Sequence, residues 1–186
     1  TGRAPVFSLS PSIGDVDILI ASELMEGGRA IMRGFVTPGR TTLITSTHRI
    51  AAVSEKINPG DGRVDGADVV AAMGIAADHV VAFDMESVAK KAGSVISSSL
   101  LGALAGSGAL PFPRDSFEDV IRGSGRGVEA SLRAFGEAYE IAKGTKSAPL
   151  PEEATAPIVP VLHIPQKLAA KWAALEARVA ALPDAV

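Results

Sequence analysis

The fold class is read from residues 17–49, DILIASELMEGGRAIMRGFVTPGRTTLITSTHR. The first five of these residues form a short apolar run, which is typical of a strand buried on both faces. A helical pattern follows over residues 24–35, and a Pro-Gly turn at 37–40 leads into a second, β-branched run at 41–47. Strand, helix and strand in this order predict a right-handed βαβ unit and a parallel sheet.

The chain downstream continues this alternation. A helical pattern at residues 65–77 precedes an apolar strand at 80–83, and further helices are expected at 84–92, 94–110, 115–121 and 127–142. An upstream strand around residues 5–9 is expected at the sheet edge, where proline is tolerated. The whole pattern predicts an α/β fold: a Rossmann-like, open, mainly parallel sheet with helices on both faces.

The C-terminal part of the chain differs in composition. Residues 144–165 are rich in proline and lack helical or strand periodicity, so we expect a linker or an extended strap. Residues 166–186 show an Ala/Leu helical pattern around Trp172. We therefore divide the chain into a domain at residues 1–143, a Pro-rich linker at 144–165, and a helix at 166–186 that starts a further region.

Composition excludes several classes of protein. The sequence has no cysteine, 4% aromatic residues and a formal net charge of −3. Without cysteine the chain can form no disulfide, thiolate zinc site or iron–sulfur cluster of its own. The acidic balance and scarce aromatics argue against nucleic-acid binding, and no apolar run reaches the ~18 residues of a membrane helix. No signal peptide is recognisable, so we expect a cytoplasmic protein that binds neither nucleic acid nor membrane.

The strongest candidate site follows the second strand. The residues at its carboxyl end are Thr45, Ser46, Thr47, His48 and Arg49, of which Thr47, His48 and Arg49 are the candidate ligand-binding residues. Ligands of open α/β sheets bind beyond the carboxyl ends of the strands. Hydroxyl, imidazole and guanidinium groups together could hold a phosphate or a carboxylate. The alternative is that the hydroxyls serve the sheet and that Arg49 is a surface charge.

Two other places carry polar candidates. Ser22 and Glu23 end the first strand on the same rim, where they could contact a ligand or a partner, or could cap the helix, with Ser22 as the N-cap. Ser97 lies where a loop enters a helix, and its alternative role is capping or helix packing. The pair Gly27-Gly28 inside the first helix predicts a close approach, either by another backbone or by a ligand.

Other motifs favour structural roles. Residues 60–62 read Gly-Asp-Gly, like the opening of a thiamine diphosphate motif, but the later asparagine is missing, so a turn is preferred. Gly102, Gly106 and Gly108 resemble part of a dinucleotide fingerprint, but they follow a helical pattern, so close helix packing is preferred. His79 and His163 have no partner at metal-site spacing. The residues predict no metal site and identify no catalytic group.

Several segments together resemble the gamma-type domain of the 2-oxoacid:acceptor (ferredoxin) oxidoreductases, and within that family the beta subunit of indolepyruvate oxidoreductase. The segments are residues 15–26, 29–30, 36–39, 41–49 and 94–104, the phrase Ala109-Leu110-Pro111-Phe112-Pro113, and the pairs Val128-Glu129 and Ala134-Phe135 in one helix. The resemblance covers about residues 5–143. The family begins with a strand and a Gly-rich turn that this sequence lacks, so we expect a fragment of a larger polypeptide.

The resemblance implies an enzyme that oxidatively decarboxylates a 2-oxoacid, transfers the acyl group to coenzyme A and passes electrons to ferredoxin. It implies that this chain is an accessory and inactive alone, with thiamine diphosphate, magnesium and iron–sulfur clusters on a large partner subunit or domain. Coenzyme A could bind at the interface with this partner. The resemblance is also compatible with a homodimer of the chain. The alternatives are a stand-alone Rossmann-like module that binds a nucleotide or coenzyme A, and a purely structural assembly domain.

Overall fold

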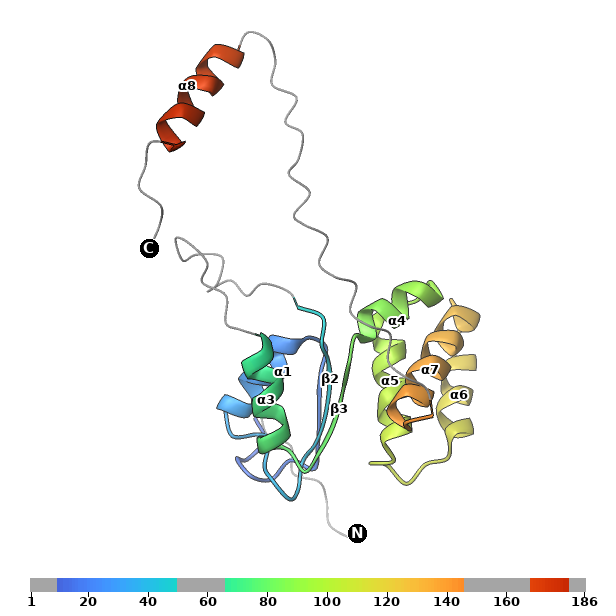
Figure 1. Ribbon diagram of the computed structural model, residues 1–186. Helices are drawn as coiled ribbons and strands as arrows, with labels where there is room; N and C mark the ends of the chain where they lie inside the picture. Colours follow the sequence, from blue (N-terminus) through green and yellow to red (C-terminus); the bar gives the residue numbers. More distant parts are fainter. Residues whose placement is uncertain (1–9, 50–65, 146–167, 181–186) are drawn as a thin grey trace. The chain divides into compact units, whose positions relative to one another are not determined.

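The computed structural model describes residues 10–49, 66–145 and 168–180 (Figure 1). The chain divides into two compact units, Thr1–Leu150 and Pro151–Val186. In the second unit the structure describes helix α8 (Ala169–Ala180), which agrees with the helical pattern of that segment. The strand expected at residues 5–9, the Gly-Asp-Gly triplet at 60–62 and most of the Pro-rich segment lie outside the described residues. The division into residues 1–143, 144–165 and 166–186 stays a prediction.

The first unit is built on three parallel strands in the order β1-β2-β3. They are β1 (Ile18–Ala21), β2 (Thr42–Ser46) and β3 (His79–Phe83). Thr42 pairs with Ile18 on one side and with His79 on the other, so the carboxyl ends of all three strands lie at one edge. The parallel βαβ arrangement predicted from residues 17–49 is confirmed.

Two helices cover one face of this sheet, α1 (Leu24–Met32) and α3 (Gly66–Ala76) (Figure 1). Leu43 of β2 is fully buried there in a cluster with Leu24, Val69 and Met73. None of the described helices is long and apolar enough to cross a membrane.

The other face packs against α4 (Met85–Ala92), α5 (Ile96–Ser107) and α7 (Val128–Ala142). Ile44, the residue after Leu43, is fully buried there with Met85 and Val88. Because successive side chains of a strand point to opposite faces, an apolar run without alternation fits a strand covered on both sides. The predicted Rossmann-like open sheet with helices on both faces is confirmed.

Helix α6 (Arg114–Arg122) packs outside α5 and α7. Its Phe117 and Ile121 join the fully buried Phe135 of α7 in a third cluster. Phe117 and Phe135 stack with ring centroids 6.3 Å apart. Since aromatic pairs of this kind add to the energy of burial, these rings fix α6 on the outer side of the domain.

The glycine pair in α1 serves packing between α1, α3 and β2. A Cβ on Gly27 would lie 3.0 Å from Met73 Cε and 3.1 Å from Thr45 Oγ1. A Cβ on Gly28 would lie 3.0 Å from a methyl carbon of Val69. The expected close approach is real, but it is made by side chains of α3 and β2 and not by another backbone.

The glycines of α5 have the structural role that the sequence favoured. A Cβ on Gly102 would lie 2.2 Å from the carbonyl oxygen of Phe135, and one on Gly106 would lie 2.5 Å from that of Tyr139. Gly108 instead ends α5 in the left-handed conformation, with φ 71°. Helices α5 and α7 thus approach each other backbone to backbone.

Candidate functional site

The carboxyl edge, defined here as the residues directly after β1 and β2, holds most of the predicted site residues. Ser22 and Glu23 follow β1, and Thr47, His48 and Arg49 follow β2. The two segments are joined, because the backbone N–H of Leu24 donates to the carbonyl oxygen of His48 at 3.1 Å. The structure therefore brings these residues to one rim of the sheet.

Glu23, not Ser22, is the N-cap of α1. Its carboxylate accepts the backbone N–H of Glu26 at 2.6 Å and that of Met25 at 2.9 Å, while Ser22 is exposed. The expectation that Ser22 caps the helix is wrong. A carboxylate offers two acceptors and a full negative charge to the helix N-terminus, which a serine hydroxyl cannot match. Both oxygens of Glu23 are thus engaged in capping.

Ser46 belongs to the hydroxyl cluster that the sequence offered as a ligand site, but its contacts give it a different role. It is fully buried, its Oγ lies 2.8 Å from Nδ1 of His48, and it accepts the backbone N–H of Met85 at 3.0 Å. One side chain therefore connects the end of β2 with the start of α4. The signal in the sequence is small: a serine ends a β-branched strand two residues before a histidine.

The neighbouring threonines serve the sheet. Thr45 is fully buried on the opposite face, and its hydroxyl lies 3.4 Å from the carbonyl oxygen of Glu23. The backbone N–H of Thr47 donates to the carbonyl of Phe83 at 3.0 Å. These contacts support the structural alternative for Thr45, and the half-buried side chains of Thr47, His48 and Arg49 remain the candidates for contact with a ligand.

Ser97 does not take part in the hydrogen bonds of the carboxyl edge. It is exposed in the first turn of α5. Its neighbours form a packing cluster, in which Ser94 Oγ lies 3.1 Å from Ser98 Oγ and 3.2 Å from Ser131 Oγ of α7. This cluster supports the packing alternative for the serine run.

A network of charges on α6 and α7 is structural. Arg114 contacts Glu118 at 2.6 Å and Glu140 at 2.8 Å, and Arg122 also contacts Glu118. The hydrogen bond from Arg114 is the main reason why the pKa of Glu118 is lowered. The network links Arg114, Glu118 and Arg122 of α6 to Glu140 of α7. Neither Arg114 nor Glu118 lines either of the two cavities described next.

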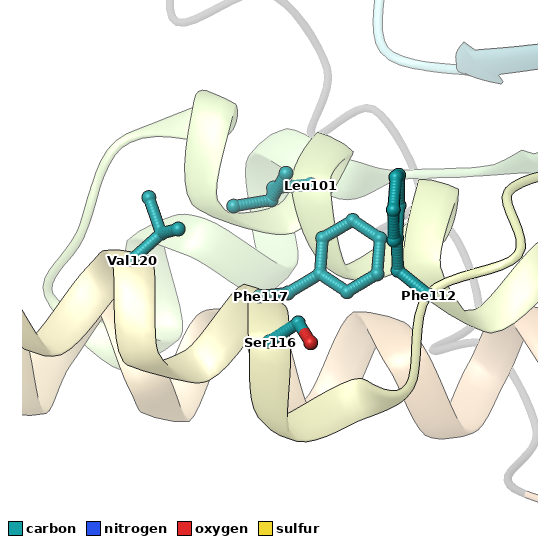
Figure 2. Close-up of a pocket in the computed structure, with 5 residues that line it drawn as sticks. All are labelled: Leu101, Phe112, Ser116, Phe117 and Val120. Atoms are coloured by element: carbon teal, nitrogen blue, oxygen red, sulfur yellow. The ribbon is translucent and has the colours of Figure 1, made fainter.

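An apolar cavity of about 250 Å³ lies over α5 and α6 (Figure 2). Its lining consists of Leu101, Phe112, Ser116, Phe117 and Val120. Phe112 and Phe117 meet edge to face, with ring centroids 6.2 Å apart. A second hollow of about 270 Å³ is lined by β3 together with Ile141 and Ala142 of α7. None of the predicted site residues lines either one.

The described side chains offer little to a metal ion. Within residues 10–49, 66–145 and 168–180, no group of three or more His, Cys, Asp or Glu side chains could hold one. The carboxyl edge instead presents an imidazole and a guanidinium beside hydroxyls. This donor set suits an oxygen anion better than a cation.

Comparison with known proteins identifies the family. A model of the pyruvate ferredoxin/flavodoxin oxidoreductase family matches residues 1–141. The comparisons with curated proteins and with solved structures return no match. The match spans both layers of helices and the carboxyl edge. With residues 1–141 of its 186 residues covered, the chain belongs to the pyruvate ferredoxin/flavodoxin oxidoreductase family.

Proposed function

We propose that this chain is the accessory, gamma-type domain of an indolepyruvate or other arylpyruvate oxidoreductase. The observation that carries the proposal is the family match over residues 1–141. The enzyme would oxidatively decarboxylate a 2-oxoacid, release carbon dioxide, transfer the acyl group to coenzyme A and pass the two electrons to ferredoxin. The segments that resemble the indolepyruvate enzyme support the arylpyruvate assignment.

The residues of this chain do not fit the redox cofactors. Iron–sulfur clusters are held by cysteine thiolates, and the sequence has none. Thiamine diphosphate is held through a magnesium ion by oxygen ligands, and the described residues show no cluster of carboxylates for that ion. We therefore assign thiamine diphosphate, magnesium and the clusters to a large partner subunit, and ferredoxin contacts this chain only indirectly.

Coenzyme A fits the donors of the carboxyl edge better. Its phosphates are oxygen anions, and His48, Arg49 and the Thr47 hydroxyl offer hydrogen bonds and positive charge. Coenzyme A supplies the thiol that accepts the acyl group. In this proposal the chain contributes binding and orientation at the interface with the large subunit, in the cytoplasm, and has no activity alone.

The test is reconstitution with a large subunit that carries thiamine diphosphate and iron–sulfur clusters. We expect a stable complex that reduces ferredoxin with indolepyruvate more efficiently than with pyruvate, while the isolated chain is inactive. If no complex forms, the subunit proposal fails. If a complex forms but prefers pyruvate, the family assignment stands and the arylpyruvate specificity is refuted.

Titration of the isolated chain with coenzyme A separates the alternatives. Coenzyme A binding by the isolated chain that is as tight as in the complex favours the stand-alone binding module. A complex that forms without any coenzyme A contact to this chain favours the purely structural assembly domain. Loss of coenzyme A binding in the complex on Arg49→Ala would support the interface proposal against both.

A further inference from the structure

The hydrogen bonds of Ser46 indicate which ring nitrogen of a neutral His48 carries the proton. Ser46 Oγ already accepts the backbone N–H of Met85 at 3.0 Å. Its one hydroxyl proton needs an acceptor, and within the described residues the side-chain partner of Ser46 is Nδ1 of His48, at 2.8 Å. The hydroxyl therefore donates to Nδ1, and the proton of the neutral imidazole lies on Nε2.

The position of Ser46 makes this arrangement rigid. The side chain is fully buried, so water does not compete for its hydroxyl. The backbone on both sides is also fixed: Met85 starts α4, and the carbonyl of His48 accepts the N–H of Leu24 in α1. Rotation of the imidazole would break the bond at Nδ1 and leave a buried hydroxyl without an acceptor.

Nε2 of His48 is then the available end of the ring. It makes no hydrogen bond within the described part of the chain, and the side chain is half-buried beyond the carboxyl end of β2. A fixed N–H at this edge of an open α/β sheet is a donor to a ligand oxygen. Arg49 follows directly in the sequence, so positive charge lies close to the same rim.

We propose that Ser46 is a positioning residue that holds His48 as the Nε2–H tautomer, so that the ring donates one hydrogen bond to a phosphate or carboxylate oxygen. The proposal rests on the proposed function of this edge as a ligand site. The proposal adds Ser46, which contacts no ligand itself but determines which ring nitrogen of His48 can donate a hydrogen bond. A purely structural Ser46 would support the start of α4 and leave the tautomer of His48 undetermined.

The first experiment reads the tautomer directly in the full chain. With histidines labelled with nitrogen-15, long-range proton–nitrogen spectra of the neutral ring distinguish the protonated from the accepting nitrogen. The signals of His48 are assigned by their loss in His48→Gln. We expect Nδ1 unprotonated and Nε2 protonated; a protonated Nδ1 in the unmodified protein overturns the proposal.

Two substitutions test the role of Ser46. Ser46→Ala should release the ring into a mixture of both tautomers. Thr45→Val is the matched control: it also removes a buried hydroxyl from β2, but on the other face, so the tautomer of His48 should be unchanged. An unchanged tautomer in Ser46→Ala, or an equal change in both variants, refutes the positioning role. If Ser46→Ala does not fold, the spectrum of the unmodified protein still tests the proposal, because a protonated Nδ1 of His48 overturns it.

The ligand is tested with inorganic phosphate and acetate as separate probes. Each probe that binds should shift the Nε2 signal of His48 in a saturable way, and Ser46→Ala should weaken that binding by about twofold, because only about half of a tautomer mixture carries the proton on Nε2. The stronger probe identifies the phosphate or the carboxylate as the ligand group. No shift with either refutes the anion site. Because these measurements use the chain alone, their failure is distinct from failure to form the oxidoreductase complex.

Discussion

Gly102 offers a direct test of how closely α5 and α7 pack. Gly102→Ala places a Cβ 2.2 Å from the carbonyl oxygen of Phe135 and 3.0 Å from Cβ of Ala138. Ordinary contacts begin at 3.4 Å, so the two helices must separate locally by about 1 Å. The obstacle is backbone, which cannot rotate away as a flexible side chain can.

The size of the effect follows from two opposing contributions. Alanine in place of glycine favours a helix by about 1 kcal/mol. Overpacking in a well-packed core costs about 1–3 kcal/mol, and the contact with Phe135 puts this site at the upper end. We expect a net loss of about 1–2 kcal/mol, which lowers the melting temperature of a domain of this size by about 3–6 °C.

Gly74 supplies the matched control. It lies in α3, and a Cβ there meets nothing within 4 Å. Gly74→Ala should therefore raise stability by about 0.5–1 kcal/mol, or about 1–3 °C. Thermal unfolding followed by circular dichroism measures both variants. If Gly102→Ala is as stable as the unmodified protein, or gains as much as Gly74→Ala, the backbone contact between α5 and α7 is refuted.

Three further predictions concern the cap, the charge network and the site. Glu23→Ala should cost about 1 kcal/mol through loss of the α1 cap, seen as a lower urea midpoint, whereas Ser22→Ala should change little; the reverse order would contradict the cap assignment. The pKa of Glu118 is lowered in the folded state, first by its hydrogen bond from Arg114, so its contribution is present above the ordinary carboxyl pKa and is lost as pH falls through the lower pKa of the folded state. Glu118→Gln should therefore unfold more easily at pH 7, and its difference from the unmodified protein should shrink as pH falls below the ordinary carboxyl pKa; a constant difference would contradict this. In the assembled enzyme, Arg49→Ala should slow acyl transfer to coenzyme A more than decarboxylation; equal loss in the two assays would exclude a phosphate-binding role.

The strands were predictable because a strand that is buried on both faces has a continuous apolar sequence without alternation. Leu43 and Ile44 are adjacent, apolar and both fully buried in clusters on opposite faces of the sheet, as expected for a strand between two helical layers. The purpose of Gly27 and Gly28 could not be predicted to the same degree. Their pattern indicates a close approach, but Met73 and Val69 lie more than forty residues away, and only the fold brings them together.

The candidate site was predictable in place but not in detail. Parallel strands bring the ends of β1 and β2 to one edge, so Glu23 and His48 were correctly expected on the same rim. The cap by Glu23 and the bond from Ser46 to His48 depend on rotamers and on the backbone of α4. Neither follows from spacing, and a buried serine inside a β-branched run looks like any other strand residue.

The alternation along β2 makes the core and the site interdependent. Ile44 and Ser46 share the face of α4, while Leu43 and Thr45 share the face of α1. Loss of Leu43 or Ile44, with the following residues shifted by one place, would put Thr45 in the position of Ile44 and turn Ser46 to the face of α1, away from the backbone N–H of Met85. A single deletion in β2 would therefore damage the apolar cluster and the carboxyl edge together, whereas a substitution can change one of them alone.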